Sequence, residues 1–152
     1  MSAESAKKYH YFLATWGYSG YCPVASGTAG TAAAIVLYYP MSFLPLWAYL
    51  LLTVFVYFLG EISADFVEFD LGNKDPGIVV IDEVVGYLIT MAFVPNTLFW
   101  IVAGFFAFRF FDIVKPGLAR LEKLGGGRGI MLDDVAAGLY SAASLYILSF
   151  FL

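Results

Sequence analysis

The sequence predicts an all-α integral membrane protein: a polytopic bundle of about five short transmembrane helices, preceded by an interfacial or re-entrant segment. Three observations lead to this fold class. Of the 152 residues, 61% are hydrophobic, only 13% are charged, and the mean hydropathy is +0.81. Soluble domains are nearer half apolar and a quarter charged. The charged residues are also confined to a few clusters, and the N-terminus lacks the pattern of a cleavable signal peptide.

Charged side chains are absent from three long stretches, residues 11–60, 84–108 and 135–152. All of them fall in the three clusters between or before these stretches, residues 4–8, 61–83 and 109–134. Because a charge at the centre of a bilayer costs several kcal/mol, the charge-free stretches are interpreted as membrane-embedded. We expect one membrane-embedded domain over residues 1–152, with residues 1–10 as a polar N-terminal tail.

The first charge-free stretch is long enough for two helices and an approach segment. Apolar density peaks at residues 29–39 and 46–59, and the two prolines of residues 40–45 predict a turn between them. Residues 11–26 contain glycine, proline and several hydroxyl groups, which is typical of an interfacial or re-entrant segment.

The second stretch allows two topologies. Residues 84–108 form one helix interrupted at Pro95, or two short helices, about 79–94 and 97–111, joined by Pro95 and Asn96. With two helices, the three charged clusters and all eight Lys and Arg lie on one side, which the positive-inside rule makes cytoplasmic. We prefer this simpler arrangement. Residues 135–152 then form the last helix.

Acidic residues stand at the edges of the apolar stretches. Asp82 and Glu83 lie between two aliphatic runs, and Asp133 and Asp134 are expected to begin the last helix. Capping that helix explains one of the latter two but not both. Glu61 and Asp65 are interpreted as a solvated helix face.

Basic residues recur beside these acids. Arg109, Asp112 and Lys115 are spaced by three, so neighbouring pairs share a helix face among phenylalanines. Clustered carboxylates without His or Cys suit Mg²⁺, Mn²⁺ or Ca²⁺. Arg109, Lys115, Arg128 and the glycine-rich residues 27–31 and 125–127 could bind a phosphate. The sequence therefore favours Mg²⁺-assisted phosphoryl transfer at a lipid interface.

Several function classes are excluded by composition. The net charge of −4 gives no basic patch for nucleic acid. Cys22 has Thr28 where a cysteine phosphatase needs arginine, and the single His10 excludes lipid phosphatases that need two histidines. Attack by water at a metal site or by a carboxylate remains open.

Four segments in order resemble the phosphatidylglycerophosphatase A family of bacterial membrane enzymes. They are residues 17–31 (GYSGYCPVASGTAGT), 74–86 (KDPGIVVIDEVVG), 108–116 (FRFFDIVKP) and 126–138 (GGRGIMLDDVAAG). Ser26 is a departure, since the family usually has proline there. The resemblance implies Mg²⁺-dependent hydrolysis of phosphatidylglycerol phosphate to phosphatidylglycerol and phosphate in glycerophospholipid synthesis, at the cytoplasmic face of the bacterial inner membrane.

The residues expected to act fall into two groups. Asp82, Glu83, Asp112, Asp133 and Asp134 are the catalytic candidates, and with Asp75 they are also the metal ligands. Arg109 and Lys115 are expected to bind the phosphomonoester, with Thr28, Thr31, Lys74 and Arg128 as further substrate contacts. The alternatives are a phosphatase of another lipid phosphomonoester and a small cation transporter without enzymatic activity. A transporter would need acids near the bilayer centre, whereas these stand at the edges of the apolar stretches.

Overall fold

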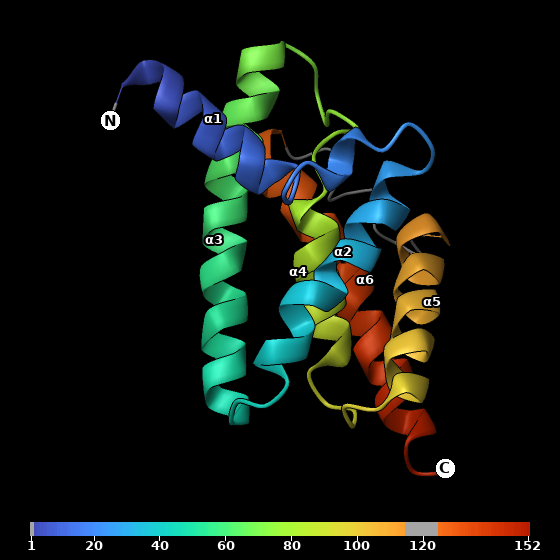
Figure 1. The fold of residues 1–152 in the computed structure, drawn as a ribbon. Coiled ribbons are helices and arrows are strands. Elements are labelled where there is room, and N and C mark those ends of the chain that lie inside the picture. Colours follow the sequence, from blue (N-terminus) through green and yellow to red (C-terminus); the bar gives the residue numbers. More distant parts are fainter. Residues whose placement is uncertain (1, 115–124) are drawn as a thin grey trace.

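The computed structural model describes residues 2–114 and 125–152, and every regular element in these two ranges is helical (Figure 1). The elements are α1 (Ala3–Ala14), the short 3₁₀ helix η1 (Ser19–Tyr21), α2 (Ser26–Met41), α3 (Leu46–Leu71), α4 (Ile81–Met91), α5 (Leu98–Val114) and α6 (Gly126–Leu148). The all-α prediction is therefore confirmed for the described part of the chain.

The long helices alternate in direction. Helices α2, α4 and α6 begin at one end of the bundle, whereas α3 and α5 end there, and α1 crosses that same end (Figure 1). The second charge-free stretch contains two helices, α4 and α5, separated by residues 92–97. The prediction of two helices in this stretch is thus confirmed. As a consequence, the described residues of the three charged clusters lie toward a common end of the bundle, which we call the charged end.

Helix α4 lies at the centre of the bundle, and its side chains pack closely against the surrounding helices. It contacts α2, α3, α5 and α6, most extensively α6. Tyr87 and Leu88 of α4 are fully buried, as are Tyr38 of α2 and Phe108 of α5. Such full burial of apolar side chains in a short helix explains how 11 residues, rising only about 16 Å, keep a fixed position.

The outer faces of α3 and α5 are strongly apolar. Trp47, Leu51 and Phe55 of α3 are 71%, 63% and 57% exposed, and Phe106 and Phe110 of α5 are 66% and 58% exposed. Apolar patches of this extent are unusual on a soluble monomer and are typical of a surface that another apolar phase covers. Two helices, Leu46–Leu71 and Gly126–Leu148, are long and apolar enough to cross a membrane.

Several boundaries differ from those expected. Residues 3–14 form one helix, which spans most of the expected polar tail and the first residues of the expected interfacial segment; Ser2 caps it by accepting a hydrogen bond from the Ser5 amide at 3.2 Å. Helix α3 has 26 residues and α6 has 23, so these two are not short. Helix α6 begins at Gly126, with Gly125 as its N-cap residue, so the expectation that Asp133 and Asp134 begin the last helix is wrong.

The caps of α6 come instead from α3. Asp65 Oδ1 accepts a hydrogen bond from the Gly127 amide at 3.2 Å, and Glu68 Oε1 accepts one from the Gly126 amide at 3.3 Å. Glu61 forms an ion pair with Arg128 at 2.9 Å. Asp65 is exposed, as the interpretation of a solvated face expects, and Glu61 is half-buried, but both side chains also hold the start of α6 against α3.

Candidate active site

Three carboxylates from two helices converge near the charged end. Asp82 and Glu83 lie in the first turn of α4, and Asp134 lies in the third turn of α6. Each offers an oxygen, and these oxygens lie within 4.8 Å of one another. We call Asp82, Glu83 and Asp134 the acidic trio. Carboxylates at such spacing repel one another unless a cation or a proton lies between them.

The local sequence explains why α4 delivers its two acids here. Val79, Val80 and Ile81 are buried, which fixes the chain just before Asp82. The Val80 amide donates a hydrogen bond to the carbonyl of Ala14, at the end of α1, at 2.9 Å. Helix α4 therefore begins at a fixed point, and its first turn can direct Asp82 and Glu83 toward α5 and α6.

Helix α5 contributes a cation and a fourth acid. Arg109 Nη1 lies 2.6 Å from Asp112 Oδ2 in the same helix and 3.7 Å from Glu83 Oε1 in α4. The side chains of Arg109, Asp112 and Glu83 are 17%, 12% and 14% exposed, so the contacts are largely shielded from water. Charge pairs that are shielded in this way interact more strongly than surface pairs. The spacing of three that the sequence showed for Arg109 and Asp112 is thus a real contact.

Helix α2 closes the site on a further side. Gly27 faces the Glu83 carboxylate and the Arg109 guanidinium, and a Cβ atom built on it would collide with Glu83 Oε1. Thr28 follows and is half-buried. Thr31 is fully buried, and its hydroxyl donates a hydrogen bond to the Gly27 carbonyl at 2.8 Å. The Thr31 hydroxyl is therefore engaged inside α2.

The trio fits a hard divalent cation. Its donors are carboxylate oxygens, the type that Mg²⁺ prefers. Asp82 Oδ1 and Glu83 Oε2 are inaccessible to solvent and accept no hydrogen bond from the described residues. Buried carboxylate oxygens without donors are costly, and a coordinated cation would remove that cost. Asp133, also buried, precedes Asp134, and Asp112 is close enough to Glu83 to interact electrostatically with it.

The remaining predicted residues lie at the margin of this cluster, apart from it, or outside the described residues. Asp75 is exposed in the segment before α4 and interacts electrostatically with Asp82. Arg128, paired with Glu61, lines a separate cavity of about 280 Å³ with Asp65. Lys115 lies outside the described residues. The structure thus brings together the acids of α4, α5 and α6 with Arg109, and it places Arg128 apart from them.

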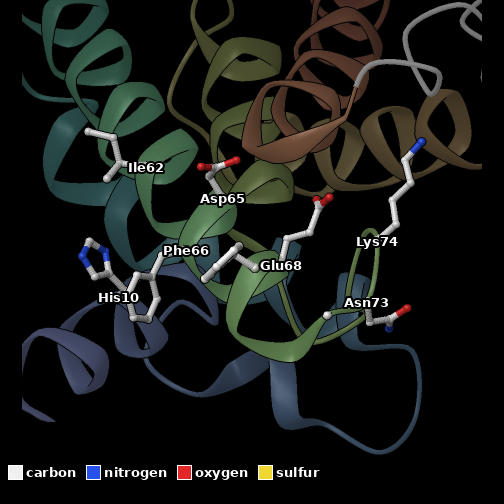
Figure 2. Close-up of a pocket in the computed structure, with 9 residues that line it drawn as sticks. His10, Ile62, Asp65, Phe66, Glu68, Asn73 and Lys74 are labelled. Carbon is white, nitrogen blue, oxygen red and sulfur yellow. The ribbon is translucent and has the colours of Figure 1, made fainter. Parts of the chain in front are cut away.

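Lys74 lines a larger cavity, of about 760 Å³, between α1, α3 and the loop that follows α3 (Figure 2). Asp65 and Glu68 extend toward the same side of α3, and His10 stacks on Phe66 with ring centroids 4.6 Å apart. The sequence reasoning missed the role of Glu68. Glu61, Asp65 and Glu68 are spaced by four and then by three residues, which places all three on one face of a helix. This spacing was the available signal in the sequence.

Comparison with known proteins identifies the family. The family model described as phosphatidylglycerophosphatase A matches residues 12–149. The phosphatidylglycerophosphatase A of Escherichia coli (strain K12) is 38% identical over 148 residues, covering 95% of this chain and 86% of the relative. That of Haemophilus influenzae is 36% identical over 149 residues, covering 93% and 90%.

A third relative carries a different name. A putative phosphatidylinositol-3-phosphatase of Bacteroides thetaiotaomicron is 42% identical over 132 residues, covering 81% of this chain and 82% of the relative. No solved structure gives a significant match. The match of the family model over nearly the whole length, together with relatives aligned over most of both chains, shows that this chain belongs to the phosphatidylglycerophosphatase A family.

Proposed function

We propose that this chain is a phosphoric monoester hydrolase that converts phosphatidylglycerol phosphate and water to phosphatidylglycerol and phosphate, in the synthesis of phosphatidylglycerol. Membership of the phosphatidylglycerophosphatase A family supports this activity. The observation that carries it is the acidic trio with the Arg109 guanidinium beside it, assembled from α4, α5 and α6 at the charged end. An anionic phosphomonoester needs both a source of positive charge and groups that orient water.

In the reaction, a water oxygen forms a new bond to phosphorus while the bond from phosphorus to the glycerol oxygen breaks. The leaving oxygen must gain a proton. The Arg109 guanidinium binds the phosphate oxygens and offsets the charge that develops on them. The carboxylates of the acidic trio, with Asp133, Asp112 and Asp75 around them, would hold Mg²⁺ or orient the attacking water. When bound, the cation would supply further positive charge beside the phosphate.

The substrate headgroup requires the site to lie at a membrane surface. We propose that α2 to α6 all cross the membrane and that α1 and η1 lie at the interface, so that residues 1–152 make one membrane-embedded domain. The described Lys and Arg residues and the acids beside them then face the cytoplasm, in a bacterial inner membrane, by the positive-inside rule. Helices as short as α4 fit if the bilayer is thinned beside them or if they are covered by their neighbours. The acyl chains of the lipid can stay in the bilayer during the reaction.

A second substrate is favoured by one observation. The relative from Bacteroides thetaiotaomicron is named as a putative phosphatidylinositol-3-phosphatase, and its identity to this chain, 42%, is of the same order as that of the phosphatidylglycerophosphatases. Phosphatidylinositol 3-phosphate is also a lipid phosphomonoester, so the same trio and guanidinium would serve it. The headgroup selectivity is therefore the point that an assay must decide.

Phosphate release from purified protein in mixed micelles tests the proposal. The panel contains phosphatidylglycerol phosphate, phosphatidylinositol 3-phosphate, phosphatidic acid and a soluble phosphomonoester, each with Mg²⁺ and with a chelator. We expect the highest kcat/KM for phosphatidylglycerol phosphate, and only with Mg²⁺. Faster turnover of phosphatidylinositol 3-phosphate would favour the second substrate. If no lipid released phosphate and the protein carried a cation flux in proteoliposomes, the protein would be a cation transporter and not an enzyme.

A further inference from the structure

In the first turn of α2, the backbone of Gly27 lies against two charged groups of the candidate active site, and no side chain separates them. Gly27 is the second residue of α2. A Cβ atom on it would collide with Glu83 Oε1, and it would stand 2.9 Å from Arg109 Nη1 and 3.2 Å from the Glu83 carboxyl carbon. Real Cβ atoms essentially never come within 3.0 Å of another heavy atom, so the contacts with Glu83 Oε1 and Arg109 Nη1 exclude a side chain unless something moves. The Glu83 carboxylate therefore occupies the space that any other residue at position 27 would fill.

Helix α2 is held in this place by contacts that do not involve the site. The Ser26 hydroxyl donates a hydrogen bond to the Gly77 carbonyl at 2.6 Å, which ties the start of α2 to the segment leading into α4. One turn later, a Cβ on Gly30 would lie 2.6 Å from the Val80 Cβ. The Ser26 hydrogen bond anchors the residue next to Gly27, and Gly30 lies against the buried Val80, so moving α2 away to make room for a side chain at position 27 would break both contacts.

We propose that Gly27 is a positioning residue, whose missing side chain lets the α2 backbone hold the Glu83 carboxylate against the Arg109 guanidinium. The inference rests on the proposed function, because it assigns Glu83 and Arg109 to phosphomonoester hydrolysis. With Gly27 in place, Glu83 is confined between α2 and the acidic trio. A side chain at position 27 pushes the carboxylate out of that position, and a displacement of about 1 Å at a reacting centre can cost about 100-fold in rate.

A glycine that serves only close helix packing behaves differently. Gly30 meets the branched Cβ of Val80, which cannot move without the backbone, so Gly30→Ala is expected to destabilise the fold. Gly27 meets the ends of two flexible side chains. Alanine is also a better helix former than glycine. Gly27→Ala is therefore expected to lower the melting temperature less than Gly30→Ala does, while kcat falls about 100-fold.

A double-mutant cycle with Glu83→Asp tests the contact. Aspartate is shorter by one methylene group and leaves room for the methyl group that Gly27→Ala introduces. We expect Glu83→Asp to lower kcat strongly in the parent protein but to leave kcat unchanged or raise it in the Gly27→Ala background. The matched control is Gly77→Ala, where an added Cβ meets nothing within 4 Å and kcat should be unchanged.

Two further readouts separate this inference from the proposed function. Mn²⁺ binding, measured by electron paramagnetic resonance, should weaken in Gly27→Ala and recover in the double variant; this holds even if no lipid is turned over. Additive effects of the two substitutions on kcat and on Mn²⁺ affinity would overturn the proposal. So would a drop in melting temperature in Gly27→Ala as large as that of Gly30→Ala and not restored by Glu83→Asp.

Discussion

Gly86 of α4 and Gly138 of α6 meet backbone to backbone: a Cβ atom on Gly138 would lie 2.5 Å from the Gly86 carbonyl oxygen and 3.1 Å from the Gly86 Cα. The crossing point lies about one turn after Asp82 and Glu83 in α4 and one turn after Asp134 in α6. Small residues that let helix backbones touch are common where helices pack in membranes. Here the close approach of the two glycines brings the acidic trio together.

Enlarging either glycine should separate α4 from α6. We expect Gly86→Val or Gly138→Val to lower the free energy of unfolding by about 1–3 kcal/mol or more. At Gly138 the added atoms meet the Gly86 backbone, and at Gly86 they meet the buried Phe108 ring and the Asp134 carbonyl. Activity should fall with the stability, since the two helices carry the acids. Reversible unfolding in mixed micelles measures the change. Ala143→Val, at an exposed position of α6, is the control, and an equal loss there would contradict the role of the crossing.

Removing charge from the acidic trio should abolish the cation-dependent reaction. Asp82→Asn and Glu83→Gln keep the size of the side chain but lose a ligand charge, so we expect no Mg²⁺-dependent phosphate release above background while the protein still inserts into membranes. Phosphate release with increasing Mg²⁺ is the measurement. Turnover at the parent rate in both variants would show that Asp82 and Glu83 do not belong to the site. Glu61→Gln is the control, and we expect it to retain activity.

Arg109 should not tolerate replacement by lysine. A guanidinium can contact Asp112, Glu83 and a phosphate with several donors at once, whereas an ammonium group is a single point of charge. We expect Arg109→Lys to lower kcat/KM about 10-fold or more, and Arg109→Gln to lower it about 100-fold, because the neutral side chain also removes the ion pair with Asp112. Steady-state kinetics on micellar substrate measure both. Equal activity of the lysine variant would show that charge alone suffices.

The ion pair between Arg128 and Glu61 should matter little for catalysis. The Arg128 side chain is 75% exposed, and exposed pairs contribute about 1 kcal/mol or less. We expect Arg128→Gln to lower stability by no more than that and to change kcat/KM by less than about twofold. A large rise in KM for the lipid would contradict this and would return Arg128 to the substrate-binding residues.

Tyr11 should resist ionisation. Partial burial and a 2.6 Å hydrogen bond to Asp70 Oδ2 raise the pKa of Tyr11 to about 12. Since the raised value belongs to the folded state, this contribution to the docking of α1 is complete below the ordinary pKa of about 10 and is lost as the pH rises through about 12. At pH 11 the tyrosinate absorbance of the parent protein and of Tyr11→Phe should therefore be nearly equal. If the absorbance of the parent protein exceeded that of Tyr11→Phe by one full tyrosinate at this pH, the hydrogen bond to Asp70 would not keep the Tyr11 hydroxyl protonated.

The sequence determined the helical class, the charged end and most of the acids of the site. These features depend on the hydropathy and charge of each residue, which the sequence shows directly. Because apolar side chains avoid water and charges avoid the bilayer, the charge-free stretches predict helices before their packing is known. The helix pair on either side of Pro95 was predictable for the same reason, because it alone keeps the charged clusters on one side. The spacing of Arg109 and Asp112 likewise needs only helix geometry.

The tertiary structure alone decided which groups meet. Asp65 and Glu68 cap α6, Arg128 pairs with Glu61, and Gly27 lies against Glu83. These contacts join residues 56 to 67 positions apart in the sequence. Such contacts depend on the rotation and depth of each helix, which are fixed by interlocking shapes at points such as Gly86 and Gly138 and leave no periodic signal in the sequence. For this reason the sequence predicts a helix start at Asp133 and Asp134, whereas α6 begins two turns earlier and carries both residues into the interior of the bundle.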